Sequence, residues 1–112
     1  MDVTTTVGNV TVLTIKGDID SNTFQQVIEK GNTVLNQGYK NLVLDLSGVN
    51  YVSSSGLVAF QSIAGRAVGM GGKVAFSGAT PKVTQVFEMT GFNKILGVFP
   101  DVAAAKASFD QT

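Results

Sequence analysis

The sequence contains no cysteine and no histidine among its 112 residues. These two absences exclude disulfide frameworks, cysteine nucleophiles, the common zinc ligand sets and acid–base catalysis by histidine. Charged residues are also scarce, at 14%, against about 25% in typical globular domains. The eight basic and eight acidic residues balance, and the basic ones are spread along the chain, which argues against a nucleic-acid partner. We therefore expect no cofactor and no metal, and a function in binding rather than catalysis.

Long apolar runs are missing as well. No stretch approaches the ~20 apolar residues of a membrane-spanning helix, and the first four residues, Met-Asp-Val-Thr, do not resemble a signal peptide. We therefore expect no membrane insertion and a cytoplasmic location. The 44% of apolar residues can fill one hydrophobic core, and the length suits one domain over residues 1–112.

The first part of the chain alternates between β-prone and helical patterns. Two β-prone runs, at 3–7 and 10–15, are joined by a Gly-Asn pair and predict an antiparallel hairpin. Apolar residues at helical spacing follow from Phe24 to Leu35, with Ser21 as the expected N-cap. The nearly continuous apolar run at 42–46 then predicts a strand that is covered on both faces.

The alternation continues to the end of the chain. We predict a helix from Ser54 to 69, a strand at 73–76 and a helix from Pro81 to 91. A strand at 95–99 and an alanine-rich helix from Pro100 to about 109 complete the prediction. The order β-β-α-β-α-β-α-β-α indicates a single α/β domain with about four helices and a mixed, mostly parallel sheet that begins with the antiparallel hairpin.

Two polar segments are predicted where strands end, which is where functional groups collect in open α/β sheets. One is Gly-Asp-Ile-Asp-Ser-Asn-Thr at 17–23, and the other, at 45–56, includes three serines at the start of a helix. The N–H groups at a helix N-terminus stabilise phosphate, so a phosphoserine would be accommodated there. Serines are equally ordinary N-caps. Gly56, in the first turn, suggests close approach of another backbone.

The acidic residues allow different interpretations. Asp18 and Asp20 either cap the following helix and aid solubility, or form a polar recognition edge beside the serines. Asp45 could instead accept a phosphoryl group, as in response regulators, with Asp18 and Asp20 as a magnesium-binding pair. That chemistry also needs a lysine, and Lys73 lies at the start of its strand rather than at its end. A serine enzyme is not supported, because the serines lack a Gly-x-Ser-x-Gly motif and a histidine base.

The stretch Leu-Asp-Leu-Ser-Gly-Val-Asn-Tyr-Val-Ser-Ser-Ser-Gly-Leu at 44–57 resembles the signature of STAS domains. This family includes the bacterial anti-sigma-factor antagonists, and the segment at 17–21 is similar to its Gly-Glu/Asp-Leu-Asp segment. The resemblance implies a non-catalytic regulatory module that, unphosphorylated, binds an anti-sigma factor that is also a serine kinase and thereby frees a sigma factor. Phosphorylation of a serine would release the module, and a phosphatase would restore it.

Alignment with the family motif places the phosphorylated serine at Ser54, with Ser55 and Ser53 as alternates. Ser53 stands where the family usually has an acidic residue. The resemblance further implies a partner-binding surface that includes Asp18, Asp20, Ser21, Asn22, Ser53, Ser55 and Gly56. The alternative within the family is a scaffold subunit of a transport or stress-signalling assembly, without a phosphate switch. A homodimer formed through the apolar region of Phe92, Val98 and Phe99 also stays open.

Overall fold

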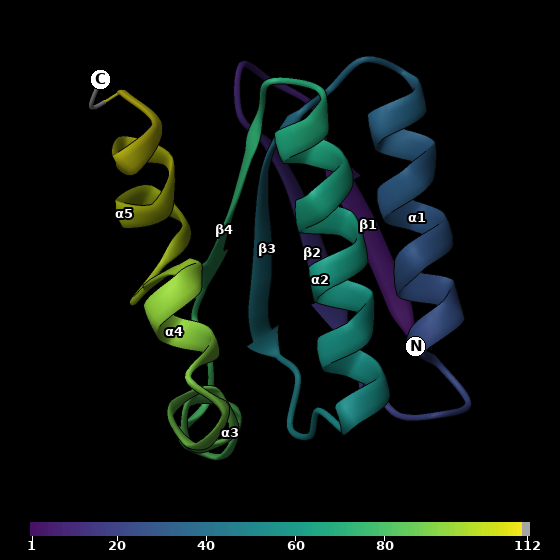
Figure 1. Ribbon diagram of the computed structural model, residues 1–112, viewed down its shortest axis with the longest axis vertical. Coiled ribbons are helices and arrows are strands. Elements are labelled where there is room, and N and C mark those ends of the chain that lie inside the picture. The colour runs from purple at the N-terminus through teal and green to yellow at the C-terminus, as the bar shows by residue number, and fades with distance from the viewer. Residues whose placement is uncertain (111–112) are drawn as a thin grey trace.

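The computed structural model describes residues 1–110, which form a five-stranded sheet with helices packed on both faces (Figure 1). The strands are β1 (Asp2–Thr6), β2 (Thr11–Lys16), β3 (Asn41–Gly48), β4 (Lys73–Ser77) and β5 (Gly97–Phe99). They lie in the sheet in the same order as in the chain. β1 runs antiparallel to β2, and every later pair of neighbours is parallel. The predicted α/β class and mixed sheet are confirmed.

Two long helices, α1 (Phe24–Asn36) and α2 (Ser54–Gly69), lie side by side over one face of the sheet (Figure 1). They approach closely because Gly31 of α1 has no side chain: a Cβ atom there would lie 2.6 Å from Cδ1 of Ile63 on α2. The chain continues through α3 (Pro81–Thr90), α4 (Phe92–Ile95), α5 (Val102–Ala107) and a 3-10 turn, Ser108–Asp110.

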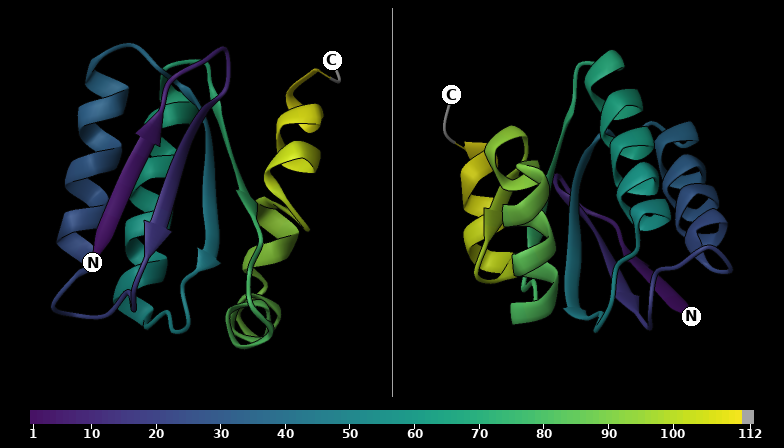
Figure 2. Two further views of the ribbon diagram at one scale, coloured as in Figure 1. Left: turned by 180° about the vertical axis from the view of Figure 1, so that it is seen from behind. Right: turned by 60° about the horizontal axis from the view of Figure 1, so that its bottom comes forward.

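The central strand β3 has apolar side chains on both faces of the sheet, so helices must pack on both faces to bury them. Leu42, Leu44 and Leu46 are fully buried in the main core, and Val43 is fully buried in a second, smaller core. The second core is closed by Ala105 of α5. Seen from behind, no helix lies over β1, and all of its residues except Val3 are exposed, whereas Val12 of the neighbouring β2 is buried in the second core (Figure 2).

Four phenylalanines form an aromatic cluster at the centre of the main core, namely Phe60, Phe76, Phe87 and Phe92. The rings of Phe87 and Phe92 stack with their centroids 5.0 Å apart, and those of Phe60 and Phe76 are equally close. Phe92 is therefore only 4% exposed. Phe92 thus belongs mainly to the core, while Val98 and Phe99 are half-buried, and association through this region stays a prediction.

Most element ends lie within one or two residues of the prediction, and three larger differences concern how elements begin. The strand expected at 95–99 is preceded by the short helix α4 and begins only at Gly97. The N-cap of α1 is Thr23 rather than Ser21, which lies in an exposed turn. The last helix begins after Asp101, whose carboxylate accepts a hydrogen bond from the Ala104 N–H (2.8 Å), so Pro100 precedes the cap.

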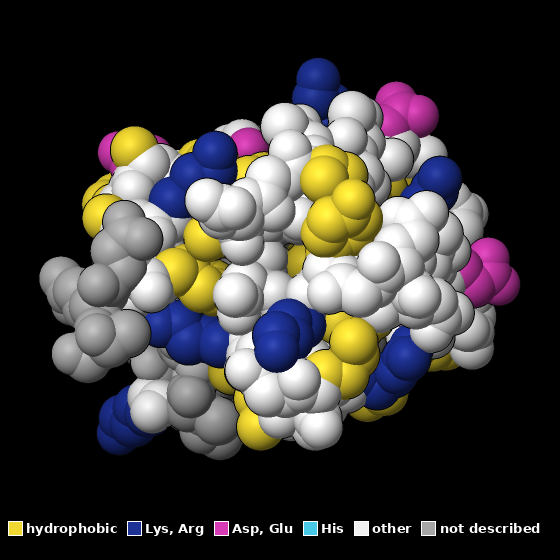
Figure 3. Space-filling model, turned by 90° about the horizontal axis from the view of Figure 1, so that it is seen from above, with side chains coloured by type: hydrophobic (Ala, Val, Ile, Leu, Met, Phe, Trp, Pro, Cys, Tyr) yellow, Lys and Arg dark blue, Asp and Glu magenta, His cyan; other side chains and the backbone are white. Residues whose placement is uncertain are grey.

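The scarcity of charge is visible on the surface. Figure 3 looks onto the end of the molecule formed by the amino ends of β3 and β4, and shows a face that is mostly uncharged, with scattered basic side chains and a few acidic ones at its rim. None of the helices within residues 1–110 has both the length and the apolar character that crossing a membrane requires.

Candidate functional site

The two polar segments predicted at the strand ends lie side by side at one end of the molecule, the lower end in Figure 1. The Ile19 N–H donates to the Tyr51 carbonyl (2.8 Å), and the Ser53 N–H donates back to the Ile19 carbonyl (2.8 Å). Ile19 and Val52 thus form an isolated parallel bridge beyond the ends of β2 and β3. The loop that carries Asp18 is therefore fixed against the loop that leads into the serines.

The three serines have three different environments. Ser53 is the N-cap of α2, and its hydroxyl accepts a hydrogen bond from the Gly56 N–H (3.4 Å). Ser54 is the first residue of the helix and is exposed to solvent, while Ser53 and Ser55 are half-buried. One serine is thus an ordinary cap, and the next presents its hydroxyl at a helix N-terminus, where N–H groups point outward.

Gly56 is buried where the first turn of α2 meets the two loops. A Cβ atom at this position would lie 2.7 Å from Cγ1 of Val52. The close approach predicted for this glycine is present, but the neighbouring atoms belong to side chains rather than to another backbone. Glycine at 56 therefore lets the first turn of α2 rest directly on the bridge between the loops.

Asp20 and Thr23 shape the loop before α1. The Thr23 hydroxyl donates to the Asp18 carbonyl (2.7 Å) and accepts from the Asp20 N–H (3.0 Å). The Asp20 carboxylate accepts from the Asn22 N–H (2.9 Å). Asp20 thus organises the turn, whereas Asp18, Ser21 and Asn22 are exposed on its surface. The N-cap of α1 is Thr23 and not one of the two aspartates, and a recognition edge formed by these carboxylates stays a prediction.

The arrangement argues against a phosphoryl acceptor at Asp45. Its carboxylate accepts from the Ser47 N–H (3.1 Å), and Ser77 of β4 is its partner in the sheet. Lys73 lies at the opposite end of β4, where its ammonium donates to the Ser108 carbonyl (3.2 Å). Within residues 1–110, acidic side chains nowhere gather in a group of three or more that would suit a metal ion. The lysine and the metal site of a receiver are thus not assembled around Asp45.

Helix α3 supplies neighbours of the serines that the sequence did not predict. The Thr80 hydroxyl, at the N-cap of α3, donates to the Val49 carbonyl (3.2 Å) and ties this helix to the loop before Ser53. A cavity of about 450 Å³ next to it is lined by Asn50, Thr80, Pro81 and Lys82. Pro81 could have indicated these neighbours. It marks the start of the helix that follows β4, and because β4 is parallel to β3, this helix begins at the same edge of the sheet as the serines.

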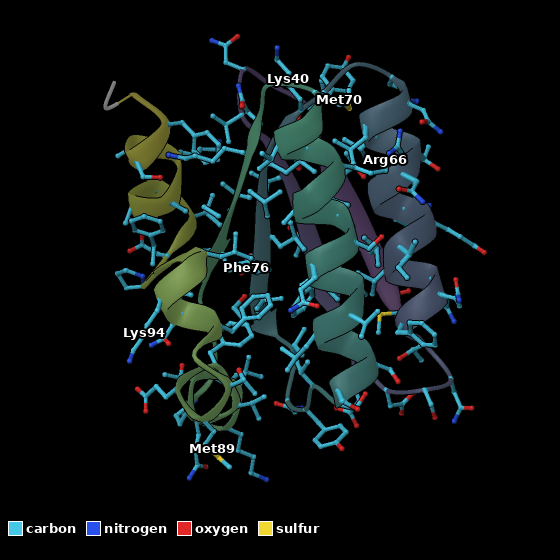
Figure 4. The ribbon with its side chains drawn as sticks, in the orientation of Figure 1. Lys40, Arg66, Met70, Phe76, Met89 and Lys94 are labelled. Carbon is cyan, nitrogen blue, oxygen red and sulfur yellow. The ribbon has the colours of Figure 1, made fainter. Side chains whose placement is uncertain are left out.

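Exposed apolar side chains at this end were missed as well. Tyr51 is 52% exposed in the loop before the serines, and Met89 of α3 is 79% exposed and points away from the protein (Figure 4). Large apolar side chains facing solvent beside a polar site are typical of a surface that another protein covers.

Comparison with known families gives one match over most of the chain. The family model described as STAS domain matches residues 3–105. A Bordetella bronchiseptica protein named as an anti-sigma factor antagonist, BtrV, is 30% identical over 95 residues, which cover 85% of this chain and 82% of the relative.

Solved structures share the fold at lower identity. A Thermotoga maritima protein described as an anti-sigma factor antagonist, TM1081, superposes with a TM-score of 0.88 at 21% identity, over 95% of this chain and 92% of that one. The anti-sigma factor antagonist SpoIIAA, in its unphosphorylated form, gives 0.81 at 16% identity, over 99% of both chains. SpoIIAA from Bacillus in its phosphorylated form gives 0.72 at 15% identity, over 96% of this chain and 99% of that one.

Proposed function

The chain belongs to the STAS domain family, and on this premise we propose that it is an anti-sigma factor antagonist switched by phosphorylation of Ser54. In its unphosphorylated form it binds an anti-sigma factor with serine kinase activity and frees a sigma factor in the cytoplasm. Phosphorylation releases it, and a phosphatase restores it. It acts by binding and not as an enzyme. We propose that residues 1–112 form this one domain.

The observation that carries the proposal is the exposed hydroxyl of Ser54 at the first residue of a 16-residue helix. The unpaired N–H groups and the positive end of the helix dipole at this position stabilise a phosphate. A kinase can reach the hydroxyl without unfolding the helix. Ser53 and Ser55 stay alternates, but the first is engaged as the N-cap and both are half-buried, so Ser54 is the most accessible of the three.

The surroundings of Ser54 explain how a phosphate would eject a bound protein. Asp18, which is exposed on the adjoining loop, already contributes negative charge, and the first turn of α2 contains no acidic or basic residue. A phosphate adds nearly two negative charges to this surface. Burying that charge in an interface without a cationic partner costs several kcal/mol, and each 1.4 kcal/mol weakens binding about tenfold.

We propose that the binding surface consists of the two loops and the helix start between them. It comprises Asp18, Asp20, Ser21, Asn22, Ser53, Ser55 and Gly56, with Tyr51 as an apolar anchor. The bridge between Ile19 and Val52 supports this assignment, because it holds the loops in one fixed arrangement. Asp20 and Gly56 act by shaping the surface, since the first organises its turn and the second is buried. The existence of SpoIIAA in phosphorylated and unphosphorylated forms also supports a phosphate switch in this family.

The test compares Ser54→Ala and Ser54→Asp in binding to a purified anti-sigma factor kinase from the same organism. We expect Ser54→Ala to bind like the unmodified protein and Ser54→Asp to bind at least tenfold more weakly. Thr33→Asp, which adds the same charge on the exposed surface of α1, is the matched control and should bind normally. Mass spectrometry after incubation with the kinase and ATP should locate phosphate on Ser54.

Equal affinities of Ser54→Ala and Ser54→Asp for the kinase would contradict the switch. Stable binding without any modification of residues 53–55 would instead favour the scaffold role.

A further inference from the structure

The outward face of α2 is unusual for a surface helix because it carries no charge. Arg66 is the one charged residue in the sequence of α2, and its guanidinium turns toward α1, where it donates to the side-chain oxygens of Asn32 (2.8 Å) and Asn36 (2.9 Å) (Figure 4). Exposed helix faces are normally polar or charged, as α1 is with Glu29 and Lys30. The α2 outward face, defined as Ser54, Val58, Gln61, Gly65 and Val68, instead exposes 54% of Val58 and 62% of Val68.

An apolar groove runs beside this face, between α2 and α4. It has a volume of about 310 Å³ and is lined by Gln61, Ala64, Gly65, Val68, Phe92 and Leu96, all uncharged. Phe92 belongs to the buried aromatic cluster, so a side chain that entered the groove would contact the edge of the main core. Its lining suits an apolar side chain and offers a charged one no partner.

Gly65 gives a third, independent observation. It lies in the middle of α2 and is exposed, where glycine is less favourable than alanine. A Cβ atom at position 65 would have no atom within 4 Å apart from the adjoining residues and the backbone of its own helix, so packing within residues 1–110 does not require glycine there. A residue without a side chain at the edge of a groove does, however, allow another molecule to approach the helix closely.

Ser54 is the first residue of the same face. Positions 54, 58 and 65 follow one another at intervals of four and seven residues, which places them in line along the helix. The helix is 16 residues long and therefore extends about 24 Å from the serine. A protein that covers Ser54 and reaches along α2 would contact both the exposed valines and the groove.

We infer that the anti-sigma factor that reads Ser54 also binds the α2 outward face and inserts an apolar side chain into the groove between α2 and α4. This inference rests on the proposed function. The partner must present an uncharged surface, because the α2 outward face offers neither a cation for a carboxylate nor an anion for an ammonium group. A phosphate on Ser54 then enters an interface in which the α2 outward face supplies no cationic side chain to neutralise it, which makes the switch effective.

The test measures binding of Gly65→Trp to the kinase that binds the unmodified protein. The tryptophan has room on the helix but fills the approach to the groove, and we expect binding to weaken at least tenfold. Thr33→Trp, on the exposed surface of α1, is the matched control and should bind normally. Val68→Arg places a charge at the rim of the groove and should weaken binding to the same extent. It replaces Gly65→Trp in the test if circular dichroism shows that Gly65→Trp does not fold.

The outcomes separate this inference from the switch itself. Normal binding by Gly65→Trp and Val68→Arg, while Ser54→Asp binds weakly, overturns the inference and leaves the proposed function intact. Equal binding by Ser54→Ala and Ser54→Asp contradicts the proposed function, whatever the groove variants do. Normal kinase binding together with loss of a homodimer in sedimentation velocity would make the groove a contact between two copies, which also overturns the inference.

Discussion

Gly56 and Ile19 lie so close together that a Cβ atom at position 56 would be 2.8 Å from Cγ2 of Ile19. Ile19 is fully buried in the loop between Asp18 and Asp20. The helix turn that presents Ser54 therefore rests directly on the loop that presents the acidic residues. One glycine sets the spacing between the two halves of the proposed binding surface.

Replacement of this glycine should separate the two halves. We expect Gly56→Ala to lower the free energy of unfolding by about 1–3 kcal/mol, because the side chains of Ile19 and Val52 must move to admit the methyl group. Urea denaturation measures the change. Gly65→Ala on the same helix is the matched control and should raise stability by about 0.5–1 kcal/mol, since its methyl group would contact no neighbouring element of the fold. A stability increase in both variants would disprove the close contact at position 56.

The cap of α2 gives a second prediction. Ser53→Ala removes the acceptor for the Gly56 N–H and should destabilise the protein by about 1 kcal/mol. Ser53→Asp restores an acceptor and adds a negative charge at the helix N-terminus, so its stability should equal or exceed that of the unmodified protein. Thermal melts at low and high salt check this, because the contribution of the charge should diminish with salt. If Ser53→Ala melts like the unmodified protein, the hydroxyl does not act as a cap.

The buried hydroxyl of Ser77 gives a third prediction. It is fully buried on β4 and finds no hydrogen-bond partner among residues 1–110. Burial of an unpaired polar group costs about 1–3 kcal/mol. Ser77→Ala should therefore leave stability unchanged or raise it, unlike most substitutions in a core. A loss of more than about 1 kcal/mol in urea denaturation would show that the hydroxyl has a partner in solution.

Arg66 links α1 to α2 and allows a fourth prediction. Its guanidinium binds two asparagine side chains one turn apart, Asn32 and Asn36. We expect Arg66→Ala to lower stability by about 0.5–1.5 kcal/mol, the net value of ordinary hydrogen bonds near a surface. In a double-mutant cycle with Asn32→Ala, the two losses should not add, because each removes the same interaction. Strict additivity would mean that the hydrogen bond contributes nothing to stability.

The sheet was predictable because its signals are local. The apolar run at 42–46 is buried on both faces in β3, and the Gly-Asn pair at 8–9 joins the antiparallel hairpin. The short helix α4 was not predictable from its own residues. Ile95, Leu96, Val98 and Phe99 have the composition of a strand, but the preceding Phe92 must stack on Phe87. After Gly91 at φ 73°, a helical turn brings its ring into the core, so a tertiary contact determines the local structure.

The candidate site was predictable in its location but not in its details. Consecutive strands end at one edge, so the loops with Asp18 and Ser54 were expected together, and they are adjacent. The N-cap of α1 was not decided by residue type, because Ser21, Asn22 and Thr23 are all good caps. Only the folded loop shows that Thr23 binds the Asp18 carbonyl and leaves Ser21 outside. Thr80 was missed because its contact to Val49 joins segments that are 31 residues apart.

The strands lie in the sheet in the order in which they occur in the chain, and this order bears on folding. Each new strand adds to the edge left by the strand before it, from β1 to β5, so no strand must wait for a later segment to be inserted beside it. Each parallel pairing nevertheless closes over one or two intervening helices, and pairing between segments that are distant in sequence slows folding. The loops around Ser54 pair only with segments that precede β5, but the two cores that support them are completed by Phe92 and by Ala105 of α5, so the binding surface forms only when the whole domain folds.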